Sequence, residues 1–421
     1  MAERIGLVNA TIFDGTGRDP YGPATLVIEG NRIMSVGPTD QISVPREAQV
    51  FDMSGHTVMP GLIDAHTHLH LIEATFWGGS SQFPGATYAY LVARNIERTL
   101  LHGFTTIRDA GGLDPSFKFA KNRGLFKGPR MYISCSSLSQ TGGHSDFRNR
   151  HERGCPAAGH PLEPPPGVCD GVDQVRQVAR EQLRSGADQI KIMAGGGAAS
   201  PTDLLDTPQF TVEEIAAAVY EARAVKKSVM AHVYVPEGIK NCAKAGVHSI
   251  EHGNFIDEES AFIMKEQGMY LVPTLSAYEL LSRYGRGQGV PEPTMEKLEV
   301  AKGAAEQGLE IGLATGLRIG SGSDIYGPNG DMKGLEIALK ASVMGSTNAL
   351  VSATRTNADM IGMGDELGTL EPGKLADLIA VHGDPVTDVS VLQDEQKIAM
   401  VFLDGQQVKG PGYNWRFAVG N

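Results

Sequence analysis

Cysteine is scarce in this sequence, with four residues in 421, and no two of them have the C-x-x-C spacing of a zinc knuckle. Neither a thiolate zinc cluster nor a scaffold held together by disulfides is therefore expected. One pairing stays open, a bridge between Cys155 and Cys169 across a single loop.

Long apolar runs are also missing. No stretch of about 18 apolar residues occurs, so no membrane-spanning helix and no membrane partner is predicted. Residues 1–7 lack the apolar core of a secretory signal. We predict a cytoplasmic protein, and a leader removed by processing stays the alternative.

Positive charge is the third deficit. The chain has 37 Lys and Arg against 49 Asp and Glu, which gives a formal net charge of −12 at pH 7. Binding to a nucleic-acid backbone requires clustered Lys and Arg, so nucleic acid is not an expected partner. The hydrophobic fraction of 41% and the charged fraction of 20% are those of a soluble globular protein.

The two ends of the chain contain short apolar runs separated by turn residues, which is typical of strands. The predicted strands are residues 5–13, 24–29, 32–36, 376–382 and 398–403. Since both ends have the same character, we predict one small β-sandwich domain built from residues 1–58 and 365–421.

The middle of the chain, residues 59–364, alternates apolar strands with helical patterns. The eight predicted strands end near His68, Arg108, Ser134, Met193, His232, His252, Thr274 and Asp324. Eight strands alternating with helices indicate an α/β fold of the (β/α)₈ type, a TIM barrel. One predicted helix starts with a capping box, Thr211 three residues before Glu214.

Potential metal ligands stand at the ends of these strands, where barrels of this kind carry their active sites. His66 and His68 are alternate residues of one strand, so both side chains point to the same face. The other candidates are Lys191, His232, His252 and Asp324.

Each candidate has an ordinary structural alternative, such as a hydrogen-bonded core histidine, a lysine reaching solvent or a helix-capping aspartate. Packing alone gives no reason for four histidines, a lysine and an aspartate to share one rim. We therefore interpret the six residues as a metal site.

At these positions the chain resembles the amidohydrolase superfamily, whose binuclear metal ligands match the six residues in identity and order. Residues 9–15 and 368–378 are similar to the flanking β-domain of that family. The resemblance extends to the branch that holds prolidase-like dipeptidases and carboxypeptidases and ochratoxin-hydrolysing amidases. The motifs that carry it are residues 141–146, 191–197 and 232–234.

The resemblance implies two divalent metal ions, with zinc favoured and manganese, cobalt and iron as alternatives. Lys191 would be carboxylated on its amine and bridge the metals, and burial favours the neutral amine that reacts with carbon dioxide. His66, His68 and Asp324 would bind one metal, and His232 and His252 the other. The family also implies a homo-oligomer, with an octamer as one form.

The predicted reaction is hydrolysis of the amide C–N bond of a small, peptide-like substrate with a carboxylate, by a hydroxide held between the metals. Xaa-Pro dipeptides, N-acyl amino acids and ochratoxin-like amides belong to this class. Asp324 would accept the water proton and pass it to the leaving amine. His144 and Tyr234 are candidates to polarise the carbonyl, and ordinary loop hydrogen bonding is the alternative for both.

Other functions fit the sequence less well. Imidazolonepropionase-like cyclic amide hydrolases and deaminases typically use one metal and no carboxylated lysine, so Lys191 speaks against them. A relative that serves only as a scaffold would have lost ligands, whereas all six are present. Residues 320–323 do not form the G-x-S-x-G motif of a serine hydrolase.

Two Gly-rich segments border the predicted site. The loop 142–171 is predicted to be a lid whose arginines bind a substrate carboxylate, with a solvated surface loop as the alternative. Its charged candidates are Arg148, Arg150, Arg153, His151 and His160. Residues 195–197 are three glycines without a P-loop frame, so we expect them to allow close approach of the backbone to the site.

Overall fold

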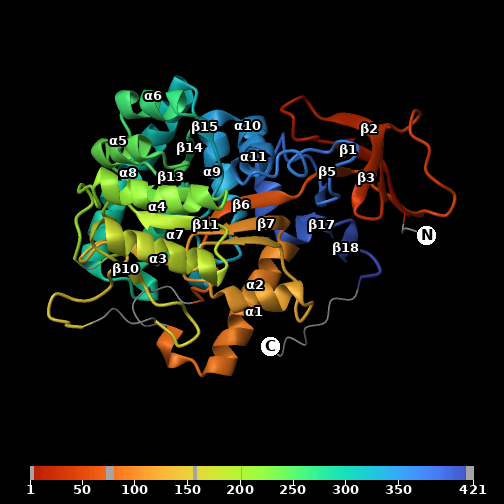
Figure 1. Cartoon of the computed structure of the whole chain (residues 1–421). Coiled ribbons are helices and arrows are strands. Elements are labelled where there is room, and N and C mark those ends of the chain that lie inside the picture. The colour runs from red at the N-terminus through yellow and green to blue at the C-terminus, as the bar shows by residue number, and fades with distance from the viewer. Residues whose placement is uncertain (1–3, 73–79, 155–158, 201, 414–421) are drawn as a thin grey trace.

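The computed structural model describes residues 4–72, 80–154, 159–200 and 202–413. A β-sheet lies at one end of the molecule and a barrel surrounded by helices at the other (Figure 1). Strands from the two ends of the chain lie side by side in that sheet, as predicted from their shared character.

The sheet has eight strands, and its two halves join where β5 pairs with β16. This pairing is antiparallel and runs from His56 opposite His382 to Pro60 opposite Leu378. Sandwich packing and the boundaries at residues 58 and 365 stay predictions. The strands are β1 (Arg4–Ile12), β2 (Tyr21–Glu29), β3 (Arg32–Pro38), β4 (Gln49–Asp52), β5 (His56–Pro60), β16 (Leu378–His382), β17 (Ile398–Leu403) and β18 (Gln406–Lys409).

Strand β16 is apolar on both faces, because each face meets a different core. Leu378 and Ala380 pack in a cluster with side chains of β1 and β2. Ile379 faces the other way and packs with barrel residues such as Leu100 and Phe104. The alternation of side chains along a strand thus explains how one apolar run holds the sheet against the barrel.

The barrel contains eight parallel strands, which confirms the predicted TIM barrel. The amide of Asp188 donates to the carbonyl of Ile133 (2.7 Å) and connects β8 to β11. On the other side, the amide of Ala65 donates to the carbonyl of Ser321 (2.9 Å). The strands are β6 (Leu62–Thr67), β7 (Phe104–Asp109), β8 (Arg130–Ile133), β11 (Gln189–Met193), β12 (Ser228–Val233), β13 (Ser249–His252), β14 (Tyr270–Val272) and β15 (Arg318–Ile319), with the short β9 (Ser137–Ser139) and β10 (Gly167–Val168) beside β11.

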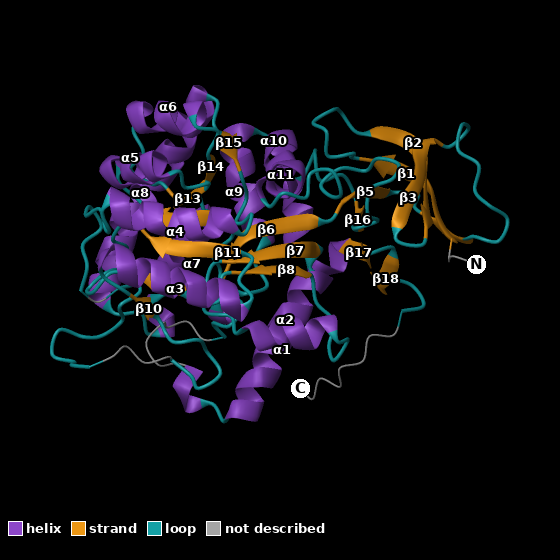
Figure 2. Cartoon of the chain, viewed as in Figure 1, coloured by secondary structure: helices purple, strands orange, loops and turns teal. Residues whose placement is uncertain are grey.

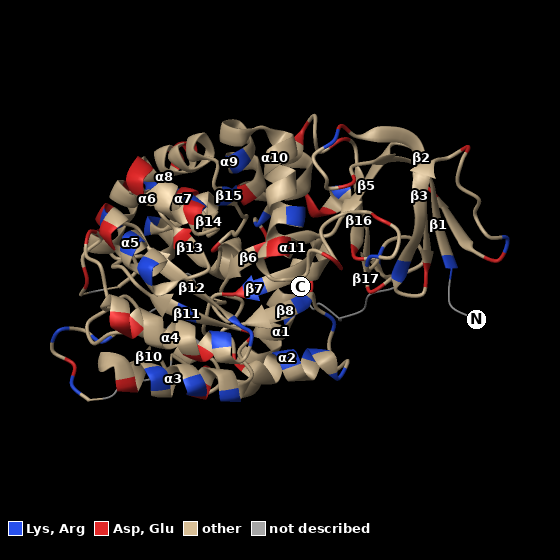
Figure 3. Ribbon diagram, turned by 45° about the horizontal axis from the view of Figure 1, so that its top comes forward, with Lys and Arg blue, Asp and Glu red and all other residues tan. Residues whose placement is uncertain are grey.

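Helices cover the outside of the barrel (Figure 2). They are α1 (Gly85–Leu101), α2 (Pro115–Asn122), α3 (Gly171–Ser185), α4 (Val212–Ala224), α5 (Pro236–Ala245), α6 (Glu258–Glu266), α7 (Leu275–Tyr284), α8 (Glu292–Thr315), α9 (Gly334–Met344), α10 (Ser346–Val351) and α11 (Asn357–Met360). Among the described residues, no helix is both long enough and apolar enough to cross a bilayer. Acidic and basic residues are interspersed over these helices (Figure 3).

The cysteines that the structure describes are Cys135, Cys169 and Cys242, and all three are buried and free. The remaining partner of the bridge considered from the sequence, Cys155, lies outside the described residues. Burial raises the pKa of the Cys169 thiol to about 12, so this side chain is a packed apolar group rather than a reactive one.

Helix α4 begins with the predicted capping box: the Thr211 hydroxyl accepts from the Glu214 amide, and the Glu214 carboxylate accepts from the Thr211 amide. Replacing Thr211 with alanine should lower the free energy of unfolding by about 1 kcal/mol. Urea unfolding followed by circular dichroism measures this change. Thr211→Ser keeps the hydroxyl and should unfold close to wild type, and equal midpoints for the two variants would contradict a role for the cap.

Candidate active site

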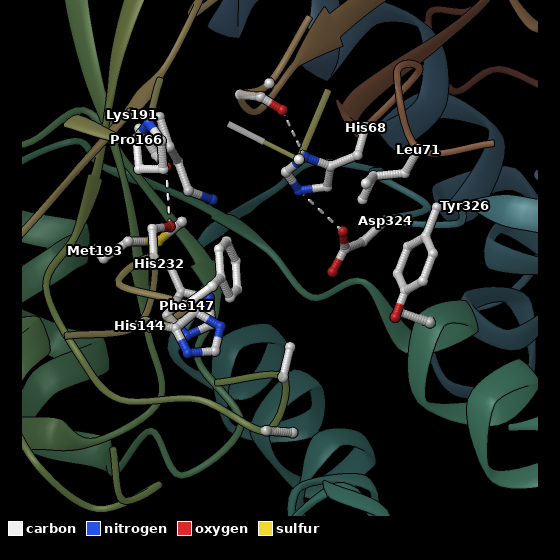
Figure 4. Close-up of a pocket in the computed structure, with 18 of the residues that line it drawn as sticks. His68, Leu71, His144, Phe147, Pro166, Lys191, Met193, His232, Asp324 and Tyr326 are labelled. Carbon is white, nitrogen blue, oxygen red and sulfur yellow. Dashed lines mark hydrogen bonds and ion pairs between the residues drawn. The ribbon is translucent and has the colours of Figure 1, made fainter. Parts of the chain in front are cut away.

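A cavity of about 600 Å³ opens at the carboxyl ends of the barrel strands. Its lining includes the six predicted metal ligands and the two residues predicted to polarise the carbonyl, namely His66, His68, Lys191, His232, His252 and Asp324, with His144 and Tyr234. In the close-up of this cavity, His68 and Asp324 point toward one another and Lys191 extends into the same space (Figure 4).

The end of β6 supplies the first two histidines, and one ring nitrogen of each is held by the protein. His66 Nδ1 donates to Glu251 Oε2 (2.8 Å), and His68 Nδ1 donates to the carbonyl of Gly111 (2.8 Å). The Nε2 atoms lie 3.6 Å and 3.4 Å from Asp324 Oδ1. The same nitrogen of both rings therefore faces one carboxylate.

The next two histidines lie at the carboxyl ends of β12 and β13, His232 one residue before the last of β12, and are held in the same manner. His232 Nε2 donates to the carbonyl of Gly196 (3.2 Å), and His252 Nδ1 bonds to the hydroxyl of Thr274 (2.7 Å). Their rings meet edge to face with centroids 4.5 Å apart. His252 and Thr274 have positive φ angles of 74° and 51°, a conformation that non-glycine residues rarely adopt and that is often found at functional sites.

Lys191 and Asp324 complete the group. The Lys191 side chain is 1% exposed in mid-β11, and its Nζ lies 3.4 Å from His66 Nε2. Burial lowers the pKa of Lys191 to about 8, which increases the share of neutral amine. Asp324 lies five residues beyond Ile319 with φ at 51°, and burial raises its pKa to about 7.

These side chains fit a divalent metal by their chemistry. Burial lowers the pKa of His68 to about 3 and those of His66, His232 and His252 well below their usual value, so the rings are neutral donors. His66, His252 and Asp324 each offer a ligand atom within 4.8 Å of the others. Neutral imidazoles with a carboxylate form a donor set suited to zinc and similar cations.

A buried ion pair below the site was not anticipated from the sequence. Arg108 on β7 donates to Glu251 Oε1 (2.8 Å) and to the carbonyl of Ala65 (2.7 Å), and both charged side chains are almost fully buried. The other oxygen of Glu251 holds His66. The available signal was a residue of opposite charge in each of two predicted barrel strands, Arg108 in residues 104–109 and Glu251 in residues 249–252.

His144 and Tyr234 lie beside the metal-ligand candidates. The His144 ring stacks on His232 with centroids 4.2 Å apart and an interplanar angle of 12°. Its Nδ1 donates to Asp203 Oδ2 (3.1 Å), a partner that the sequence did not indicate. The Tyr234 ring contacts His232 and the ring of Tyr278, and burial keeps the pKa of Tyr234 above its usual value.

The loop 142–171 has one arginine at the cavity. Arg148 lines the cavity but is paired with Asp146 through two hydrogen bonds of 2.7 Å and 2.6 Å. Arg150, His151 and Arg153 are exposed and do not contribute to the described lining. The exposure of Arg150 and Arg153 matches the solvated surface loop given as the alternative, and the arginine clamp stays a prediction.

Two further histidines near the cavity have different environments. His160 stacks on Tyr88 with centroids 4.0 Å apart and bonds to the carbonyl of Phe83, so its role is structural. His70 lines the cavity with its ring against Gly112, and within the described residues its buried Nδ1 has no hydrogen-bond partner. The pattern His66, His68, His70 would have indicated this third histidine.

Known proteins match the chain along most of its length. The family model described as Amidohydrolase family covers residues 57–408. Ochratoxinase from Aspergillus niger is 32% identical over 424 residues, which span 97% of this chain and 88% of that protein. The crystal structure of a prolidase complexed with N-methylphosphonate-L-proline is 37% identical with a TM-score of 0.91, covering 97% of this chain and 100% of that one.

A weaker likeness extends to a different reaction. Imidazolonepropionase from Deinococcus radiodurans is 24% identical, over 91% of this chain and 92% of that protein. The higher identities to ochratoxinase and the prolidase agree with the branch indicated by residues 141–146, 191–197 and 232–234.

Glu251→Gln should weaken metal binding by about 10- to 100-fold, the usual effect of losing the partner that orients a ligating histidine. The amide group can donate to His66 Nδ1, which would favour the tautomer with its proton on Nε2, the nitrogen that faces Asp324. Metal titration followed by elemental analysis measures the change. Glu259→Gln removes an exposed partner of Lys240 and should bind metal as wild type does, so equal affinities for both variants would contradict the role of Glu251.

Proposed function

The chain belongs to the amidohydrolase family, a family of hydrolases that includes enzymes acting on C–N bonds, and we propose that it is a binuclear metal-dependent amidohydrolase. The proposed substrates are small amides with a free carboxylate, such as Xaa-Pro dipeptides and N-acyl amino acids, including ochratoxin-like amides. The likeness to a prolidase and to ochratoxinase supports this class.

One observation carries the proposal. Each of four histidines at the cavity has one ring nitrogen held by the protein, which leaves the other nitrogen free of that partner. Lys191 and Asp324 lie among these rings. His66, His68 and Asp324 would hold one metal, His232 and His252 the other, with carboxylated Lys191 as the bridge; zinc is the proposed ion.

When bound, the metals would polarise the substrate carbonyl and acidify a water molecule. Asp324 would take the proton from the attacking water at a carboxylate oxygen and release it to the nitrogen of the leaving amine. A carboxylate can serve in both steps, because it accepts the water proton at one oxygen and donates it from the same oxygen to the amine.

The remaining lining residues would bind and orient the substrate. Tyr234 stays protonated, because burial raises its pKa, and can donate to the carbonyl oxygen. Much of the wall around the cavity is apolar, which suits a hydrophobic side chain on the acyl or amine part. Its apolar members include Leu71, Phe147, Met193, Leu281, Val290 and Leu298.

A cyclic amide hydrolase like imidazolonepropionase is the second candidate, and its weaker sequence likeness is the observation in its favour. Lys191 lies among the candidate ligands and favours the binuclear enzyme, because a carboxylated lysine would bridge two metals. A hydrolysis screen on the metal-loaded enzyme separates the two. We expect turnover of Xaa-Pro dipeptides, N-acyl amino acids or ochratoxin-like amides, and turnover confined to cyclic imides or to purine deamination would overturn the assignment.

Lys191→Ala should abolish activity and most metal uptake, because the cluster loses the group that would bridge the two cations. Elemental analysis of the purified variant and its hydrolysis rate measure both effects. Lys244→Ala changes an exposed lysine of α5 and should retain the activity and metal content of wild type. Clearly fewer than two metals per active wild-type chain would contradict the binuclear model.

Chelation offers an independent test. Removal of metal should eliminate hydrolysis, and added zinc should restore it, since the histidine-rich donor set suits that ion. Full activity after exhaustive chelation, confirmed by elemental analysis, would exclude a metal-dependent mechanism.

A further inference from the structure

We propose that Asp203 is a positioning residue that fixes the orientation and tautomer of His144, so that His144 Nε2 meets the bound substrate. The proposal deepens the hydrolase function and rests on it. The residues that carry it come from the loop after β11 and from helix α8, two parts of the chain outside the metal-ligand cluster.

Asp203 holds His144 through a buried carboxylate. The side chain of Asp203 is 2% exposed, and its Oδ2 accepts from three groups: His144 Nδ1 (3.1 Å), the Gly197 amide (3.0 Å) and Gln209 Nε2 (3.2 Å). The amide oxygen of Gln209 accepts from the backbone amide of His144 (3.0 Å). Side chain and backbone of His144 are thus held by the same segment.

Gly197 provides the space for the ring. A Cβ at this position would lie 2.1 Å from His144 Cε1, a distance that no packed side chain allows. The His144 ring therefore lies flat between Gly197 and the stacked ring of His232. This close approach is the structural reason for the last of the three consecutive glycines.

Lys297 on α8 anchors the same loop from outside. Its Nζ donates to the carbonyls of Gly197 (3.0 Å), Ser200 (2.7 Å) and Asp203 (3.3 Å), and lies 3.5 Å from Asp203 Oδ1. The positive charge also favours the ionised carboxylate, and the pKa of Asp203 is lowered by its bonds to His144 and Lys297 despite burial. The folded protein therefore holds the Asp203 carboxylate, in its charged form, next to His144 Nδ1.

A carboxylate accepts only, so it selects the form of His144 that carries a proton on Nδ1. With Nδ1 occupied, Nε2 is the ring nitrogen available to a substrate in the cavity that His144 lines. Asp203 is not among the residues that line the cavity, so its effect on a substrate must pass through His144.

Asp203→Asn tests the proposal with almost no change of volume. The neutral amide is a weaker acceptor and lacks the negative charge that holds the proton on Nδ1, so kcat/KM for an Xaa-Pro dipeptide should fall about 100-fold, the scale of a misplaced active-site group. Affinity for N-methylphosphonate-L-proline, measured by calorimetry, should fall about 10-fold, while metal content stays unchanged. Asp206→Asn alters an exposed carboxylate three residues away and should behave as wild type.

A double-variant cycle separates positioning from general support of the loop. If Asp203 acts through His144, then Asp203→Asn should cost nothing further in a His144→Ala background. A loss of the same size in both backgrounds would overturn the inference, as would a single variant equal to wild type.

The two proposals fail in different ways. A wild-type enzyme that hydrolyses no amide substrate removes the proposed function, and binding of the phosphonate then still decides the role of Asp203. Equal affinities of wild type and Asp203→Asn for the phosphonate, or no binding by either, overturn that role.

Discussion

The ion pair between Arg108 and Glu251 is the interaction on which the geometry of the site depends. A charge in the barrel interior is costly unless a partner and hydrogen bonds compensate it. Arg108 supplies that partner, and Ser249 adds a hydrogen bond of 2.6 Å to the same carboxylate oxygen. The other oxygen of Glu251 is then free to hold Nδ1 of His66, so this buried ion pair fixes the direction of a candidate metal ligand.

Burial shifts the pKa values of the basic and the acidic groups in the site in opposite directions, because it disfavours the charged form of each. It keeps the histidines neutral and shifts the pKa of Lys191 downward, which prepares nitrogen donors for a cation. It also raises the pKa of Asp324, because the same loss of hydration disfavours the carboxylate form. Left-handed backbone at His252 and Asp324 aims these groups inward, a local strain that the surrounding strands must sustain.

Local patterns were sufficient to predict the barrel and the residues at its rim. Seven strand ends lie within two residues of their predicted positions, because apolar runs and flanking turns are short-range features. The partners Glu251 and Asp203 were not predictable, since their contacts with His66 and His144 join residues 185 and 59 positions apart. The start of helix α7 has no such local signal, because the helix follows the left-handed Thr274 directly and has no side-chain cap.

The pairing of β5 with β16 has a consequence for biosynthesis. Strand β5 is made early, yet its antiparallel partner emerges from the ribosome more than 300 residues later, as the register of Thr57 with Val381 shows. Until then, the edge of β5 that pairs with β16 has no partner, and contacts this distant in sequence form slowly. Folding during synthesis can therefore complete the barrel before the sheet. The sheet is completed only when β16 has been translated and pairs with β5.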